Sequence, residues 1–155
     1  MNIEQTIRDY LPQIPHMSLA TVSGNAPWVC EVHFAYDDSL NLYFRSLPSR
    51  RHCREIAANP NVAGNIVTQH PLNLAPRCVS FEGTAKQLTG GDEEATAFEC
   101  LSERLGIPAK VMEEAKREHH FYKLSVNKYY LFDARDTKPS QKFELAWNGG
   151  HESQK

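Results

Sequence analysis

The strongest constraint on the fold is a run of short β-rich segments separated by tight turns. Residues 17–22, 28–36 and 40–46 are rich in apolar and β-branched side chains, and the turns Ser23-Gly24-Asn25 and Asp37-Asp38-Ser39 separate them. Turns of this length join antiparallel neighbours. We therefore expect these three segments to be consecutive, paired strands of an antiparallel sheet.

The rest of the chain continues this mixture of strands and helices. Apolar periodicity and turn residues predict helices over residues 3–11, 49–58 and 108–116, and strands over residues 62–69, 78–88, 121–132 and 143–147. A further helix is expected to open at Thr89-Gly90-Gly91-Asp92, with Thr89 or Asp92 as its N-cap, and to end near Leu105. Gly83 indicates a bulge or bend in its strand. Many short strands with segregated helices predict an α+β protein built on a barrel.

Composition narrows the class of protein. The length of 155 residues predicts one domain over residues 1–148, followed by a frayed polar tail over residues 149–155. A net charge of −2 without a long Lys/Arg run argues against nucleic acid as a partner. We find no apolar stretch of about 18 residues and no signal peptide, so we expect no membrane partner and a cytoplasmic location.

The cysteines and histidines show no metal-binding pattern. The four cysteines, at positions 30, 53, 78 and 100, are widely spaced and form no C-x-x-C motif. In a cytoplasmic chain they are expected to be free thiols. The histidines have no chelating i, i+4 spacing, and adjacent His119 and His120 would point to opposite faces of an extended segment. We therefore expect no metal site.

The start of one predicted helix carries the wrong charge. Arg50, Arg51 and His52 follow Ser49, the expected N-cap residue, and so lie in the first turn. The helix dipole and unpaired backbone N–H groups make this end positive, so each cation there costs roughly 0.3–1 kcal/mol unless something compensates it. The simplest compensation is a bound anion, and a phosphate suits a helix start flanked by arginines.

The preceding strand would bring further polar groups to the same place. Arg45 and Ser46 end that strand, and only Leu47-Pro48 separates them from the helix start. A guanidinium can bind two phosphate oxygens, and serine hydroxyls can bind others. The alternative is a solvated basic patch that binds nothing. Composition alone does not decide between these two interpretations.

Several segments, taken in order, match a known pattern. They are a strand containing Leu19-Ala20-Thr21-Val22, residues 27–36, the strand around Tyr43-Phe44, the run Ser49-Arg50-Arg51 ahead of Asn59-Pro60, and residues 79–85, which resemble a V-x-G-x-A strand around Gly83. This ordered set resembles the FMN-binding split-barrel family related to pyridoxamine 5′-phosphate oxidase, and is most similar to its short branch. The resemblance implies a six-stranded antiparallel split β-barrel with flanking helices, forming a homodimer with FMN in a cleft between subunits.

The resemblance also implies which residues bind the cofactor. They are Val29, Cys30, Glu31 and Val32 along the flavin ring, Tyr43, Phe44, Arg45 and Ser46 beside the ribityl chain and phosphate, Ser49, Arg50 and Arg51 on the phosphate, and Gln69 or Arg77 near the ring of the partner's flavin. Two of these residues depart from the family. Thr or Ser is common there at the position of Arg45, and Lys is common at the position of Arg51.

The implied activity is FMN-dependent oxidoreduction, with NAD(P)H or a small reduced substrate as electron donor. The C-terminal Arg-x-His pattern of pyridoxamine phosphate oxidases is absent, so we do not expect pyridoxal phosphate synthesis.

The alternatives are a non-catalytic module of the same fold that binds flavin, deazaflavin or haem, and a dimeric structural protein without cofactor. Haem would need an axial ligand, for which His119, His120 and His151 are available. Trp28 and Trp147 either stack on a flavin or belong to the core. His33 is either a proton donor or a structural residue of its strand. Cys30 is either a reactive thiol or a buried, inert one.

Overall fold

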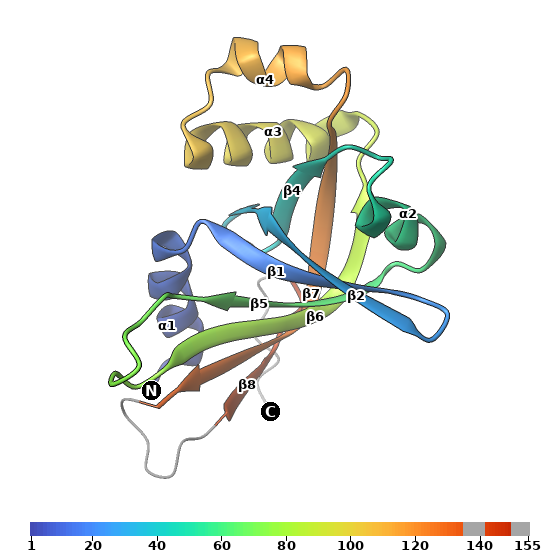
Figure 1. Cartoon of the computed structure of the whole chain (residues 1–155). Helices are drawn as coiled ribbons and strands as arrows, with labels where there is room; N and C mark the ends of the chain where they lie inside the picture. Colours follow the sequence, from blue (N-terminus) through green and yellow to red (C-terminus); the bar gives the residue numbers. More distant parts are fainter. Residues whose placement is uncertain (135–141, 150–155) are drawn as a thin grey trace.

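The protein is an antiparallel sheet that curls on itself, with helices around it (Figure 1). The computed structural model describes residues 1–134 and 142–149. Within them the strands are β1 (His16–Ser23), β2 (Ala26–His33), β3 (Ala35–Tyr36), β4 (Leu42–Ser46), β5 (Asn61–Val67), β6 (Arg77–Gln87), β7 (His120–Asp133) and β8 (Lys142–Ala146). They are ordered β2-β1-β5-β6-β7-β4-β3, and β8 also pairs with β7.

The two ends of this sheet come from one stretch of chain. β2 and β3 stand at opposite ends of the strand order, yet only the buried residue Phe34 separates them in sequence. The sheet must therefore curl until its ends meet, which produces the split barrel. This corrects one expectation, because the segment predicted as a single strand over residues 28–36 is broken at Phe34. As a result β2 pairs with β1 while β3 pairs with β4, and β2 and β4 are not ladder neighbours.

The α+β class is confirmed, but the six-strand prediction is wrong: the described residues contain eight strands in one sheet. The difference arises at β3 and β8. The 14-residue strand β7 is long enough for one of its edges to serve two partners, β4 along residues 120–124 and β8 along residues 128–132. The predicted bulge is confirmed, since the β6–β7 register shifts between Glu82 and Gly83.

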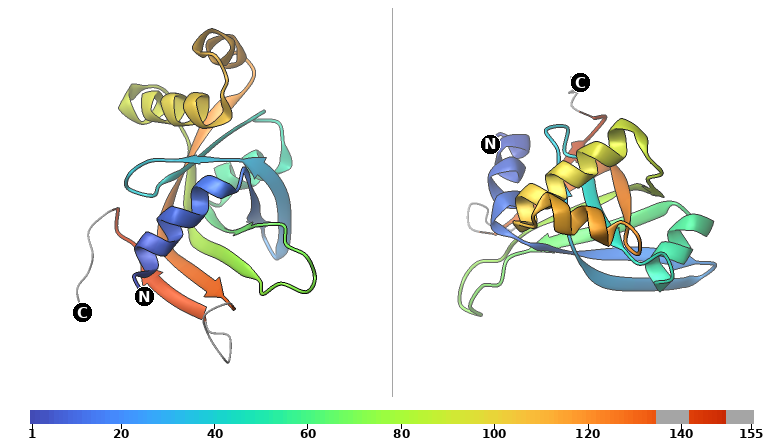
Figure 2. Two further views of the ribbon diagram at one scale, coloured as in Figure 1. Left: turned by 90° about the vertical axis from the view of Figure 1, so that its left-hand side faces the viewer. Right: turned by 90° about the horizontal axis from the view of Figure 1, so that it is seen from above.

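The helices surround the barrel on several sides. They are α1 (Ile3–Tyr10), which leads into the 3₁₀ turn η1 (Leu11–Gln13), then α2 (Arg51–Ala58), α3 (Gly91–Leu105) and α4 (Ala109–Ala115). α3 and α4 stack over one end of the sheet, α1 runs along one side, and α2 lies next to β1 and β2 (Figures 1 and 2). No helix in residues 1–134 or 142–149 is long and apolar enough to cross a membrane.

Two helix starts differ from the prediction. α2 begins at Arg51 and its N-cap is Arg50, whose side chain forms no capping bond, so the assignment of Ser49 as N-cap is wrong. A turn in which the Arg50 N–H donates to the Leu47 carbonyl at 3.0 Å delays the helix. The N-cap of α3 is Gly90 at φ 90° rather than Thr89 or Asp92, because the chain enters this helix through a left-handed residue.

Two apolar clusters fill the fold. One occupies the barrel and is closed by α1, and its members include Ile7, Tyr10, Leu19, Phe44, Ile66, Phe81, Leu124 and Tyr129. The other lies between the sheet and α3–α4, and its members include Ala35, Tyr43, Leu101, Met112 and Phe121. β4 passes between the clusters, so both of its faces are covered. Trp147 packs edge-on against Tyr129 in the first cluster, which makes it a core residue.

Candidate functional site

A cleft of about 790 Å³ opens where β2, the end of β4 and the start of α2 meet. Its lining residues are Trp28, Cys30, Glu31, Val32 and His33 of β2, Arg45, Ser46 and Leu47 at the end of β4, Arg50, Arg51 and His52 at the start of α2, Leu105 and Ile107 after α3, and His119 before β7. The antiparallel barrel brings these segments together, since β2 and β4 lie near opposite ends of the same curled sheet. The volume is in the range of small-molecule sites.

The cleft is positively charged at one end. Arg45 is half-buried and Arg50 is exposed, and neither forms an ion pair with an acidic side chain of the described residues. Arg51 differs, because its Nε donates to Glu55 Oε1 at 2.8 Å and its guanidinium lies 4.4 Å from the centre of the Trp28 ring. The first turn of α2 contains no acidic residue. Two cleft arginines therefore have no acidic partner in the described residues, Arg50 at the N-terminus of α2 and Arg45 near the end of β4, as suits an anion site.

Two histidines of the cleft, His52 and His33, add little charge. Burial, together with the nearby Arg50, lowers the pKa of His52. His52 Nε2 and Ser46 Oγ are 2.9 Å apart, so this ring fixes the serine hydroxyl at the base of the cleft. Burial and the neighbouring His16, whose ring centre is 4.2 Å away, likewise lower the pKa of His33. The arginines are thus the positive groups next to His52 near neutral pH.

The β2 side of the cleft offers backbone groups. β2 is the terminal strand of the sheet order, so within the described residues its outer edge has no strand partner. Free N–H and C=O groups on such an edge can pair with a ligand. Burial raises the pKa of Cys30 to about 11, so its thiol is protonated and unreactive near neutral pH. Glu31 accepts a hydrogen bond from the Ser18 hydroxyl across the β1–β2 pair.

The opposite wall is mostly apolar and includes one unpaired nitrogen. Leu105 and Ile107 flank the turn that ends α3, which bends at Gly106 in a left-handed conformation. His119 Nδ1 is buried and has no hydrogen-bond partner among residues 1–134 and 142–149. By contrast, His120 Nδ1 lies 2.7 Å from Gln87 Nε2. His119 therefore lines the cleft and has a buried ring nitrogen without a partner in the described residues.

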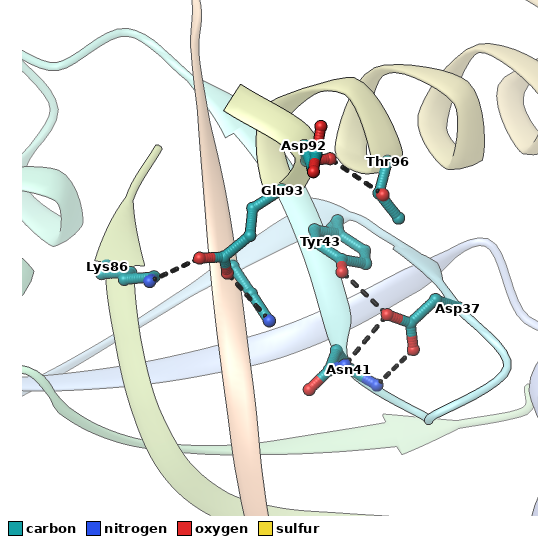
Figure 3. A network of polar contacts seen from close by, with 8 residues as sticks. Asp37, Asn41, Tyr43, Lys86, Asp92, Glu93 and Thr96 are labelled. Carbon is teal, nitrogen blue, oxygen red and sulfur yellow. Dashed lines mark hydrogen bonds and ion pairs between the residues drawn. The ribbon is translucent and has the colours of Figure 1, made fainter. Parts of the chain in front are cut away.

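The cleft collects some of the predicted cofactor residues and leaves others outside. Cys30, Glu31, Val32, Arg45, Ser46, Arg50 and Arg51 line it. Tyr43 and Phe44 are buried on the two faces of β4: Phe44 stacks on Tyr122 in the barrel, and the Tyr43 hydroxyl donates to Asp37 Oδ2 at 2.8 Å beneath the start of α3 (Figure 3). Their side chains therefore do not line the cleft.

The remaining predicted residues lie elsewhere. The side chain of Val29 is on the outer face of β2, and Ser49 is exposed in the turn before α2, where its carbonyl accepts from Arg54. Gln69 lines a separate hollow of about 700 Å³ between η1, β1 and β5. Arg77 pairs with Asp133, with Nε 3.1 Å from Oδ2, and packs against the Tyr10 ring. The cleft of this chain does not include Gln69 or Arg77.

Sequence analysis missed one buried acid next to the cleft. Glu55 is only 7% exposed, and it accepts hydrogen bonds from Thr21 Oγ1 at 2.5 Å and from Arg51. These bonds, with the positive charges of Arg51 and Arg54, hold the pKa of Glu55 below its ordinary value, against the opposing effect of burial. Glu55 is therefore ionised near neutral pH. The neutral thiol of Cys30 and the neutral ring of His52 also face it.

The lowered pKa of Glu55 makes a testable contribution to stability. Ionised Glu55 stabilises the fold above its ordinary pKa, near 4.5, and this contribution is lost as the pH falls through the lowered folded value. Wild type should therefore exceed Glu55→Gln in free energy of unfolding at about pH 7, and the difference should shrink at about pH 3.5. Urea unfolding of both proteins at the two pH values measures this. A difference that grows toward acid pH would contradict it.

Comparison with known proteins agrees with the fold of the chain. The family model described as pyridoxamine 5′-phosphate oxidase matches residues 3–133. A conserved hypothetical protein from Mycobacterium tuberculosis has a TM-score of 0.75 at 16% identity, with 87% of each chain covered. HutZ, the haem storage protein of Vibrio cholerae, has a TM-score of 0.69 at 16% identity, covering 97% of this chain and 98% of its own. An FAD-binding protein of Mesorhizobium loti has a TM-score of 0.64 at 19% identity, covering 81% and 89%.

At these identities the solved structures show a shared fold and no more. No curated protein matches the chain in sequence. The family model, however, spans most of the chain, from α1 to the end of β7. The chain belongs to the pyridoxamine 5′-phosphate oxidase family.

Proposed function

We propose that the cleft binds FMN, with the phosphate at the start of α2 and the flavin ring along the edge of β2. The observation that carries this proposal is the pair of arginines that line the cleft without an acidic partner in the described residues, Arg50 at the start of α2 and Arg45 near the end of β4. Arg51 supplies a third cation and Ser46 a hydroxyl. This donor set suits a phosphate dianion.

The rest of the cleft fits the remaining parts of FMN. The unpaired backbone edge of β2 offers donors and acceptors to the polar rim of a flavin, and Leu47, Leu105 and Ile107 provide apolar contact for its ring. When bound, FMN supplies hydride and electron transfer, and the protein supplies binding, orientation and electrostatics. We propose an oxidoreductase that takes electrons from NAD(P)H or a small reduced substrate. A deazaflavin with a phosphate would use the same anion site.

Haem is the second candidate, because of His119. His119 lines the cleft, and its buried Nδ1 has no partner in the described residues, so coordination of haem iron by Nδ1 would break no hydrogen bond. The Vibrio cholerae neighbour is named a haem storage protein. His120 is engaged with Gln87, and His151 lies outside the described residues. The arginines would then meet haem propionates in place of a phosphate.

We also propose that two copies of the chain associate through the outer face of the sheet. Val29 and Val67 are exposed there, at 58% and 43%. They share this face because Val29 pairs with Ala20, Ala20 with Ala63, and Val67 follows Ala63 at an even spacing. Light scattering after gel filtration tests the proposal: a dimer mass supports it, and a monomer at all concentrations contradicts it.

The absorption spectrum of the freshly purified protein tests the cofactor proposal. We expect flavin bands, or their appearance after FMN is added and excess removed. A Soret band that disappears in His119→Ala would favour haem instead. A colourless protein that retains neither added FMN nor added haem would contradict both candidates.

A further inference from the structure

Arg51 is held in place more firmly than an ordinary surface arginine. Its guanidinium lies over the Trp28 ring, 4.4 Å from the centroid, and its Nε donates to Glu55 Oε1 at 2.8 Å. Stacking fixes the plane of the group, and the Nε bond fixes its rotation in that plane. Only Nε is used by Glu55, so the terminal nitrogens, which carry most of the five donor hydrogens, remain available at the cleft.

Glu55 is itself anchored from another element. An exposed i, i+4 ion pair restrains its partners weakly. Here the carboxylate is 7% exposed, and its second oxygen accepts from Thr21 Oγ1 of β1 at 2.5 Å. Thr21 is 2% exposed and pairs in register with Trp28 of β2. The strand pair Thr21–Trp28 and the helix pair Arg51–Glu55 therefore form a closed four-residue cluster, in which each member limits the movement of the next.

This cluster is hard to explain as charge balance alone. A carboxylate beside Arg51 reduces the positive potential that an anion site needs, and its burial has a desolvation cost. The hydrogen bonds to Thr21 and Arg51 offset that cost. What the arrangement provides is orientation, since a preformed guanidinium loses less side-chain entropy when it binds a ligand.

We infer that Thr21 and Glu55 are positioning residues that orient Arg51 for a phosphate group, and so contribute to selectivity for phosphorylated over unphosphorylated ligands. The inference rests on the proposed function for the identity of the ligand. The orientation of Arg51 over Trp28 does not depend on any ligand. The two parts can therefore be tested separately.

Thr21→Val is the informative variant, because it removes the hydroxyl that anchors Glu55 and leaves every charge in place. Thr21→Ser is the matched control that keeps the hydroxyl. Thr21→Val should weaken FMN binding by roughly 3-fold to 10-fold, as expected for one lost hydrogen bond acting through its neighbour, and should leave riboflavin binding unchanged. Flavin-fluorescence titrations of wild type and both variants with FMN and riboflavin measure this ratio.

Fluorescence without ligand gives the second readout. Trp28 emission, isolated as the difference between each protein and its Trp28→Phe version, should change in Thr21→Val and Glu55→Gln as Arg51 loosens, and should stay as in wild type in Thr21→Ser.

Wild type that shows no preference for FMN over riboflavin would contradict the proposed function. If Thr21→Val keeps the preference for FMN and shows unchanged Trp28 emission, the inference is overturned while the proposed function still stands. Equal loss of both ligands in Thr21→Val would also overturn it, because that result indicates a general structural role.

Discussion

The double variant Arg50→Ala, Arg51→Ala should bind FMN roughly 10²-fold to 10⁴-fold more weakly than wild type, because each arginine contributes a charge-assisted hydrogen bond of about 1.5–3 kcal/mol to the phosphate. Riboflavin has no phosphate, so its affinity should change by less than about threefold. Both side chains line the cleft at the start of α2, and Arg50 has no acidic partner in the part of the chain that the structure describes.

Arg54→Ala provides the matched control. Arg54 is exposed on the same helix and contacts the Ser49 carbonyl rather than the cleft. It carries the same charge as the two arginines of the site, so a general effect of net charge would appear in it too. We expect its FMN affinity to stay near that of wild type. Equal losses of FMN and riboflavin in the double variant, or an equal FMN loss in Arg54→Ala, would refute the assignment of the phosphate site.

Gly83→Ala should be strongly destabilising, lowering the free energy of unfolding by about 2–4 kcal/mol. A Cβ at this position would lie 2.2 Å from the Ser125 carbonyl oxygen and 2.9 Å from Val126 Cα, both in the backbone of β7. The β6–β7 register shifts at this glycine, so the two strands would have to separate at the bulge. Neither contact can be relieved by rotating a side chain.

Gly24→Asn tests whether the effect is specific to that close approach. Gly24 has φ +56° in the β1–β2 turn, nothing lies within 4 Å of a Cβ built there, and asparagine tolerates the left-handed conformation. Its free energy of unfolding should stay within about 0.5 kcal/mol of wild type. Urea denaturation measures both variants. A Gly83→Ala protein as stable as Gly24→Asn would show that the bulge yields easily.

The sequence predicted local features better than long-range pairing. Tight turns, alternation and the Gly83 bulge depend on neighbouring residues, and the structure confirms the bulge. The break at Phe34 was not predictable from alternation, because residues on both sides of it have strand character. What separates β2 from β3 is that each meets a different partner at opposite ends of a closed sheet. A local pattern contains no information on that closure.

The candidate site shows the same limit. The basic start of α2 is visible in the sequence because charge conflicts with the helix dipole over a few residues. Tyr43 and Phe44 fall outside the cleft because both faces of β4 are covered. Helices cover its outer face and the barrel interior covers its inner face, and the alternation within a single strand does not reveal this. Glu55 was missed because an i, i+4 Arg–Glu pair is typical of a solvated surface. Its anchor, Thr21, lies 34 positions earlier in the chain.

Titration of the cofactor-free wild-type protein with FMN and with riboflavin, followed by quenching of flavin fluorescence, tests the central claim most directly. The cleft is proposed to bind a phosphate through its arginines, of which Arg45 and Arg50 have no acidic partner in the described residues. Saturable FMN binding that is roughly 10²-fold or more tighter than riboflavin binding is the predicted result. Equal affinities for the two flavins, or no saturable binding of FMN, would contradict the account.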